Sequence, residues 1–503
     1  MRATRIYLIL LAAIAGNISS VLALMIVARF SGSEVLGTLA YWLALAAILG
    51  VPLSLDLDSA HLRIVAIRQN PEDKARAVGA YALLKICLAA ISVVVILTAA
   101  IAGFMNVDGH SQDPYFLLAL SLFVVLMGLS TIFSSTFAAY GHTARQQLPQ
   151  LIGSITRSVV LSLLAIAAAS ALWLSGSYVL GSLITLGLGV VLFRGYSVKR
   201  ARKDDISEYL RVGGPLMAAP VFVIALTNLD KILLGRFWDS STVGEYYLVQ
   251  TLAFSLLLIG RAVRVVLIQG FAEDIKSGSM ERIEEQSRKV AKFLILLFLP
   301  LVLFAFAFSD PYLGFVFGSS YEKTGFLLAI ILAGVGVSLL ADPLTSFITA
   351  SGKTIKILIS NIIGFAVSMV LLLALVPESI GSFRLAGLAG VGAGAAFTIS
   401  GFVQIVYYRL HTRNIHSYFP LKTVSTIIVA NAGALGASLL ASMVLDSSHL
   451  SEFSLVLVPI LFFGISFLGV FYMKALSRED LQHVRRAIST KTMTEYVKSE
   501  LRE

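Results

Sequence analysis

The feature that most constrains the fold of this chain is a series of long apolar segments that occupies most of its length. Fourteen segments, each about 20 residues long, follow one another with short polar connections. A helix of about 20 apolar residues crosses the hydrocarbon of a bilayer and satisfies its own backbone hydrogen bonds there. The sequence therefore predicts an all-α, polytopic membrane protein with about 14 transmembrane helices. We expect these helices at 6–28, 36–55, 77–102, 114–138, 149–169, 172–193, 213–234, 246–268, 291–309, 326–349, 357–376, 385–407, 423–445 and 455–475.

Composition and charge agree with this class. Of the 503 residues, 57% are hydrophobic and 14% are charged, whereas soluble domains average about 45–50% apolar and about 25% charged residues. The net charge of +10 does not indicate a nucleic-acid partner, because cytoplasmic loops of membrane proteins collect Lys and Arg. With the N-terminus inside, the outer loops hold few basic residues (Arg29, Arg236, Lys323 and Arg384). We therefore expect both termini in the cytoplasm and the protein in the cell (plasma or inner) membrane, surrounded by membrane lipids.

The sequence predicts neither a cofactor nor a metal. The single cysteine, Cys87, excludes a multi-cysteine metal site and a disulfide framework. Residues 351–354 (SGKT) resemble the end of a phosphate-binding P-loop, but Phe347 occupies the position of its first glycine. No nucleophile–base pair with informative spacing is visible. We therefore expect a protein that is not an enzyme.

Two internal matches indicate a duplication. Residues 28–37 (ARFSGSEVLG) and 235–244 (GRFWDSSTVG) share Arg, Phe, Ser and Gly at an offset of 207, and residues 135–153 match 346–364 at an offset of 211. Because an even number of spans separates the copies, we predict two parallel six-helix lobes around a central cavity, plus an appended helix pair. The expected domains are an N-lobe at 1–196, a C-lobe at 197–410, the appended spans at 411–475 and a basic cytoplasmic tail at 476–503.

Residues 230–237 (DKILLGRF) followed by 243–246 (VGEY) resemble the D-x-x-x-L-G-x-x…V-G-x-Y pattern of polysaccharide (O-antigen-type) flippases. These flippases belong to the multidrug/oligosaccharidyl-lipid/polysaccharide exporter superfamily. Residues 26–37 and the loop at 350–353 are similar to that family too. The resemblance implies a flippase that carries a polyprenyl-pyrophosphate-linked oligosaccharide to the outer leaflet by alternating access. It also implies glycosyltransferases or polymerases of the same pathway as partners. The chain departs from many such flippases in having fourteen predicted spans rather than twelve.

Cations inside the predicted spans are the candidates for substrate binding. Charge in hydrocarbon costs at least ~2.5–3.5 kcal/mol and normally faces an aqueous or paired interior. Guanidinium groups hold pyrophosphate through forked donors, and lysine adds a point charge. For Lys85, Arg157 and Arg264, snorkelling toward the interface is the alternative. The candidates, which come from both lobes, are Lys85, Arg157, Arg261 and Arg264.

Acidic residues and prolines in or beside the spans supply the other candidates. The carboxylates are expected to couple an ion or to pair with cations, and Lys231 is expected to pair locally with its neighbour Asp230. Prolines at the start of the seventh span are hinge candidates, because proline interrupts the helical hydrogen-bond ladder. These residues are Asp56, Asp58, Asp230, Asp342, Pro215 and Pro220.

Two other functions compete with the flippase. A cation-coupled multidrug exporter of the same superfamily would rely on carboxylates, whereas cations outnumber acids inside these spans. A membrane-embedded glycan polymerase or ligase needs catalytic residues in sizeable outer loops, and the longest predicted outer loop spans only 310–325. The flippase is therefore the function that the sequence favours.

Overall fold

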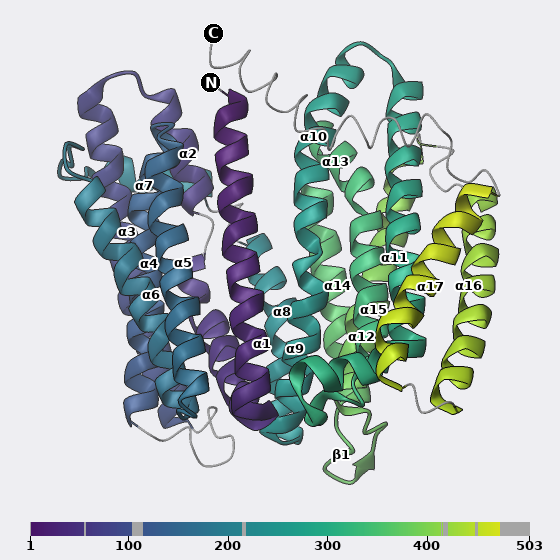
Figure 1. The fold of residues 1–503 in the computed structure, drawn as a ribbon. Coiled ribbons are helices and arrows are strands. Elements are labelled where there is room, and N and C mark those ends of the chain that lie inside the picture. Colours follow the sequence, from purple (N-terminus) through teal and green to yellow (C-terminus); the bar gives the residue numbers. More distant parts are fainter. Residues whose placement is uncertain are drawn as a thin grey trace. The chain divides into compact units, whose positions relative to one another are not determined.

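The computed structural model describes residues 2–54, 57–102, 114–213, 218–413, 415, 421–447 and 451–472. Regular structure in this part is almost entirely helical (Figure 1), which confirms the predicted all-α class. The strands within these ranges form one antiparallel hairpin, β1 (Ser379–Ile380) and β2 (Phe383–Arg384). The helices are α1 (Arg2–Leu49), α2 (Leu57–Ile67), α3 (Pro71–Ile101), α4 (Pro114–Ala139), α5 (Thr143–Ile166), α6 (Ala171–Leu192), α7 (Lys203–Gly213), α8 (Ala218–Phe237), α9 (Ser240–Ser255), α10 (Leu257–Lys276), α11 (Met280–Phe317), α12 (Gly325–Leu340), α13 (Asp342–Ala350), α14 (Ile355–Leu375), α15 (Ala389–His411), α16 (Leu421–Ser447) and α17 (Ser451–Tyr472), with short 3-10 turns at Val51–Ser54 and Ser319–Tyr321.

Within the described residues, 11 helices are long and apolar enough to cross a membrane. The count is lower than fourteen partly because α1 carries the first two predicted spans, which the non-helical Gly32 (φ 79°, ψ 177°) separates. Two further predicted spans fall in α8 and in α17, whose apolar part, Leu455–Phe471, is shorter. Each predicted apolar segment therefore overlaps a helix. The polytopic membrane class is confirmed, and the number of spans is approximate.

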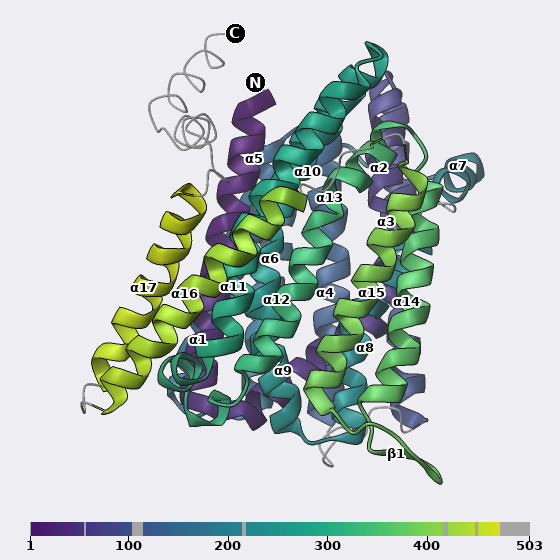
Figure 2. The same ribbon diagram turned by 90° about the vertical axis from the view of Figure 1, so that its right-hand side faces the viewer.

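Packing divides the chain into two compact units, which are described separately. One unit comprises residues 5–248 and 369–393, and the other comprises 1–4, 249–368 and 394–503. In the first unit α4 packs against α3, α5 and α6 (Figure 1). In the second, α11 packs against α12 and α16, and α16 lies beside α17 (Figure 2). The division after Leu248 assigns α8 to the unit of α1–α7, whereas the lobe boundaries at 196 and 410 stay a prediction.

The first pair of repeated segments packs together with reciprocal contacts inside one unit. A Cβ on Gly37 would lie 1.6 Å from the carbonyl oxygen of Ser240, and a Cβ on Gly244 would lie 1.9 Å from that of Ser33. The repeat offset of 207 converts Ser33 into Ser240 and Gly37 into Gly244, so each contact is the copy of the other. A two-fold axis generates contacts of this reciprocal kind. The packing therefore supports the predicted duplication.

The second pair of repeated segments forms the same helix–turn–helix in both copies. Gly141 follows α4 with φ 74°, and Gly352 follows α13 with φ 72°. In each copy the residue after the glycine donates its N–H to the carbonyl five residues earlier, at 2.8 Å and 3.1 Å. This is the Schellman arrangement, which needs a left-handed residue and so favours glycine. The two copies therefore share a glycine at the same position because the turn requires a left-handed backbone there.

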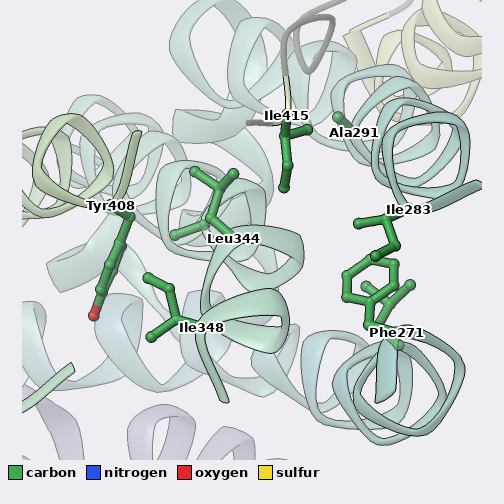
Figure 3. Packing of buried hydrophobic residues seen from close by; sticks show 9 residues of the cluster. Phe271, Ile283, Ala291, Leu344, Ile348, Tyr408 and Ile415 are labelled. Carbon is green, nitrogen blue, oxygen red and sulfur yellow. The ribbon is translucent and has the colours of Figure 1, made fainter. Parts of the chain in front are cut away.

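A buried cluster in the second unit holds α10 against α11, α13 and α15 (Figure 3). Phe271 of α10 contacts this cluster together with Leu344 of α13 and Tyr408 of α15, and all three are nearly inaccessible to solvent. Such interdigitated packing leaves little freedom for the helices to slide. The cluster therefore fixes which residues of α10 face α13.

Candidate functional site

Arg157 of α5 is a half-buried cation inside a predicted membrane span. Its Nη2 donates to Ser20 Oγ of α1 at 2.8 Å, and its guanidinium carbon lies 5.0 Å from the ring centroid of Tyr178 in α6. Among the described residues no carboxylate forms an ion pair with it. A hydroxyl and an aromatic face orient a guanidinium without neutralising it. Arg157 therefore retains its charge and several donors for an anion.

The surroundings of Arg157 fix its position. The Tyr178 ring lies 6.1 Å from Trp42 and 5.9 Å from Phe123, measured between ring centroids. A Cβ on Gly181 of α6 would lie only 2.8 Å from the Cβ of Arg157. The glycine thus lets α6 approach α5 closely, which places the aromatic face beside the guanidinium.

Lys85 of α3 is completely buried and its ammonium is already bound. Nζ lies 2.8 Å from Asp58 Oδ1, donates to the Leu53 carbonyl at 2.9 Å and lies 5.7 Å from the Tyr81 ring centroid. The Tyr81 hydroxyl donates to the same Asp58 oxygen. This site joins α2, α3 and the turn before α2. Lys85 therefore pairs inside the protein, as Asp58 was expected to do, rather than reaching the interface.

Asp230 and Lys231 of α8 form a second closed pair. Lys231 Nζ lies 2.9 Å from Asp230 Oδ1 and donates to the Thr227 carbonyl at 2.6 Å. The Tyr246 hydroxyl of α9 donates to Asp230 Oδ2 at 2.6 Å. Both charged residues are 3% exposed, so the local pairing expected from the sequence is present and closed to solvent.

Arg264 of α10 and Asp342 of α13 form the third pair. Arg264 Nε donates to Asp342 Oδ1 at 3.1 Å, and Nη2 donates to the same oxygen. The Asp342 side chain is 2% exposed, whereas that of Arg264 is 50% exposed. One partner is therefore part of the core, and the other also faces out of it.

The remaining candidates are only partly covered by the structure. Arg261 lies in α10, one turn before Arg264, and its side chain is outside the described part. Asp56 and Pro215 also lie outside the described residues. Pro220 is the third residue of α8. The residues just before α8 lie outside the described part, so the role of Pro220 as a hinge stays a prediction.

Sequence reasoning missed a buried polar site that docks α7. His61 of α2 stacks on Tyr81, and its Nδ1 lies 2.5 Å from the hydroxyl of Tyr209 in α7. Beside it, Arg68 pairs with Asp205 of α7 at 2.9 Å and with Glu208. No sequence spacing marks these contacts, because they join segments more than 130 residues apart. The one available signal in the sequence was the amphipathic pattern of residues 203–213, in which apolar residues recur at helical spacing.

The described charged residues among those that the sequence singled out therefore fall into two kinds. Asp58, Asp230 and Asp342 pair with cations within the protein, and Arg157 carries a charge that no described acid neutralises. An oriented guanidinium among apolar helices can bind an anion through its forked donors.

Comparison with solved structures defines the class of this fold. The chain is similar to a structure described as "Lipid II flippase MurJ, inward closed conformation", with a TM-score of 0.71 and 14% identity, covering 92% of this chain and 98% of that chain. It is also similar to an inward-facing multidrug resistance MATE family transporter of the MOP superfamily, with a TM-score of 0.62, 12% identity, and coverage of 81% and 98%. The MATE transporter VcmN of Vibrio cholerae matches with a TM-score of 0.53, 14% identity, and coverage of 82% and 97%. The fold is thus that of MOP superfamily transporters.

A family model identifies the chain more closely. The model described as "Polysaccharide biosynthesis protein" matches residues 26–325, and the chain belongs to this family. None of the curated proteins matches the chain. The resemblance to polysaccharide flippases of the exporter superfamily, which was carried by residues 230–246, is confirmed.

Proposed function

We propose that this protein moves an oligosaccharide linked to a polyprenyl pyrophosphate from the cytoplasmic to the outer leaflet by alternating access, for assembly of a cell-surface polysaccharide or glycan. The observation that carries the proposal is Arg157, a guanidinium oriented inside the membrane helices that no described acid neutralises. Forked donors match the oxygens of a pyrophosphate. Membership of a polysaccharide biosynthesis family supports a glycan as the cargo.

Within this proposal the four predicted cations have different roles. Arg157 binds the pyrophosphate, and Arg261 and Arg264 of α10 stay predicted binders of the anionic cargo. Lys85 instead fixes α2 against α3, because Asp58 and a backbone carbonyl occupy its ammonium. The protein acts as a transporter rather than an enzyme, and enzymes that make or polymerise the lipid-linked glycan supply and consume its cargo.

The driving force in this proposal is the membrane potential. A pyrophosphate-linked lipid carries roughly two negative charges, and an inside-negative potential favours its outward movement by ~2.3 kcal/mol per charge per 100 mV. Flipping then proceeds without nucleotide hydrolysis, which accords with a sequence in which no P-loop is recognised.

The test uses the purified full-length protein in sealed vesicles that contain a fluorescent polyprenyl-pyrophosphate oligosaccharide. Arg157→Ala should slow flipping about 10- to 100-fold, because a hydrogen bond to a charged group contributes about 1.5–3 kcal/mol. Arg157→Lys should recover only part of the rate, because the charge returns without the fork. Arg145→Ala is the matched control, since it removes an exposed arginine near the start of the same helix.

Three results would contradict the proposal. They are a wild-type rate for Arg157→Ala, an absolute requirement for ATP, and export of cationic dyes with no movement of the lipid-linked glycan. The last result would favour the cation-coupled multidrug exporter.

A further inference from the structure

The Arg264–Asp342 pair treats the two oxygens of its carboxylate very differently. Both Arg264 contacts go to Asp342 Oδ1. The other oxygen, Oδ2, is buried and has no hydrogen-bond partner among the described residues. A buried carboxylate oxygen without a donor is costly, because its hydration is lost and nothing replaces it. Binding of another species to Oδ2 would relieve this cost and thereby weaken the ion pair between Asp342 and Arg264.

The space around Oδ2 restricts what that species is. A Cβ on Gly260 would lie 2.4 Å from Oδ2 and 2.2 Å from Leu339 Cδ2, so the Gly260 backbone and an apolar side chain cover the oxygen. A hard metal cation needs about six oxygen ligands, and the described residues provide no group of three or more metal-ligating side chains. A proton needs one oxygen and almost no space. The geometry points to a proton.

The opposite side of the pair faces outward. Half of the Arg264 side chain is exposed, although its partner Asp342 is buried and follows Ala341 of the buried cluster in the chain. While Asp342 is ionised, it occupies Nε and Nη2 of Arg264 and neutralises its charge. When Asp342 carries a proton, the charge of the guanidinium is no longer neutralised and both donors are released, on a side chain that is half exposed.

We propose that Asp342 is a proton-binding site that exchanges Arg264 between its own carboxylate and the anionic phosphate of the transported lipid. One proton adds to Oδ2, the ion pair to Oδ1 is released, and Arg264 binds a phosphate oxygen. Loss of the proton restores the pair, which then competes with the phosphate and promotes its release. This inference rests on the proposed function, because it requires an anionic cargo.

Among the described side chains, those that face Asp342 from the surrounding helices leave this exchange to Arg264. Arg264 is the charged side chain that contacts it from α10, and the buried phenol of Tyr408 in α15 lies within electrostatic range of both. Among the described side chains, α11 and α12 contribute no ion pair to it. A proton on Asp342 therefore changes the charge that Arg264 presents.

The first measurement detects the proton without any ligand. Infrared difference spectra of the purified protein in lipid nanodiscs are recorded as the pH is lowered from 9 to 5. We expect the carbonyl band of a protonated carboxylic acid, which Asp342→Asn abolishes. Glu281→Gln, which removes an exposed carboxylate at the start of α11, should leave the band intact. A titration without any band that depends on Asp342 overturns the proposal.

The second measurement detects the exchange, with farnesyl pyrophosphate as the probe. Wild-type affinity should rise as the pH falls, by up to about tenfold per pH unit, because one proton is bound with the ligand. Asp342→Asn should bind tightly at every pH and retain only the dependence caused by the ligand's own titration. Arg264→Gln should bind weakly at every pH. An Asp342→Asn profile parallel to that of the wild type overturns the exchange.

The two proposals fail in different ways. If the wild type flips the lipid-linked glycan but Asp342→Asn leaves the pH profile unchanged, the function stands and the proton exchange is wrong. If the infrared band is present but neither protein binds pyrophosphate or flips the glycan lipid, the anionic cargo is wrong. Thermal unfolding of each variant shows whether it still folds. If Arg264→Gln does not fold, Arg264→Lys, which keeps the charge without the forked donors, is used in its place.

Discussion

At the scale of single residues, most of the described intramembrane charge is balanced within the protein. Asp230 and Lys231 are adjacent in the chain and both are nearly inaccessible, yet each finds further partners in Thr227 and Tyr246. Taking two charges out of water is expensive, and the pair survives because nearly all of its donors and acceptors are used. Such a pair organises α8 against α9 and is poorly suited to bind cargo.

Removing one partner of this pair should be much worse than removing both. Lys231→Met leaves the Asp230 carboxylate buried without its cation, and we expect unfolding to become easier by about 3–5 kcal/mol. The double variant Asp230→Asn/Lys231→Met should recover more than half of that loss. Thermal unfolding in detergent measures both. Additive losses in the double variant would show that the two charges do not stabilise each other.

At the scale of elements, α7 is held to α2 and α3 by polar contacts that depend on pH. Burial, reinforced by the nearby Lys85 ammonium, lowers the pKa of His61 to about 3. Partial burial tends to raise the pKa of Asp205, but the Arg202 amide and Arg68 more than offset this, so it lies below its usual range. Both groups bind protons more readily when α7 is released. Docking is therefore strongest near neutral pH and weakens as the pH falls.

The pH range in which α7 docking weakens is set by His61 and Asp205. His61, whose pKa burial holds at about 3 instead of its usual 6.5, costs stability progressively as the pH drops from 6.5 toward 3. Asp205 adds to the loss only below about pH 4. A spin label attached to Ser207→Cys, in a Cys87→Ser background, should become mobile across this range. His61→Phe keeps the stacking on Tyr81 and should move the onset to about pH 4. An unchanged onset in His61→Phe would show that His61 is not the titrating group.

The elements themselves were readable from the sequence to a large extent, and their contacts were not. Apolar runs mark membrane helices because hydrocarbon excludes unpaired backbone, so every predicted segment overlaps a helix. The break at Gly32 lies in the polar connection that the sequence predicts between the first two spans, at 29–35, although helical structure continues on both sides of it within α1. Arg264 and Asp342 are 78 residues apart, and only the fold reveals that they pair. Arg157 was identified from its depth in the span, whereas Ser20 and Tyr178, which orient it, carry no sequence signal.

At the scale of the whole molecule, the duplicated segments meet where neither copy tolerates a side chain. Gly37 and Gly244 occupy equivalent repeat positions, and each approaches a carbonyl of the other copy to within 2 Å of where its own Cβ would stand. Real Cβ atoms do not approach an oxygen so closely, so one helix must move if either glycine is replaced. The reciprocity has a consequence that few contacts offer, namely that two mutations 207 positions apart in sequence should behave alike.

We therefore expect Gly37→Ala and Gly244→Ala to lower the midpoint of thermal unfolding by similar amounts. Forcing an extra carbon into a packed contact typically costs about 1–3 kcal/mol. The double variant should cost less than the sum, because the helix displacement that relieves one clash also relieves the other. Gly433→Ala in α16 is the control: no atom lies within 4 Å of its added carbon, and alanine favours the helix by roughly 0.5–1 kcal/mol. If one of the two glycines tolerates alanine while the other does not, the two halves do not share this contact symmetrically, and the duplicated arrangement would have to be rejected at this point.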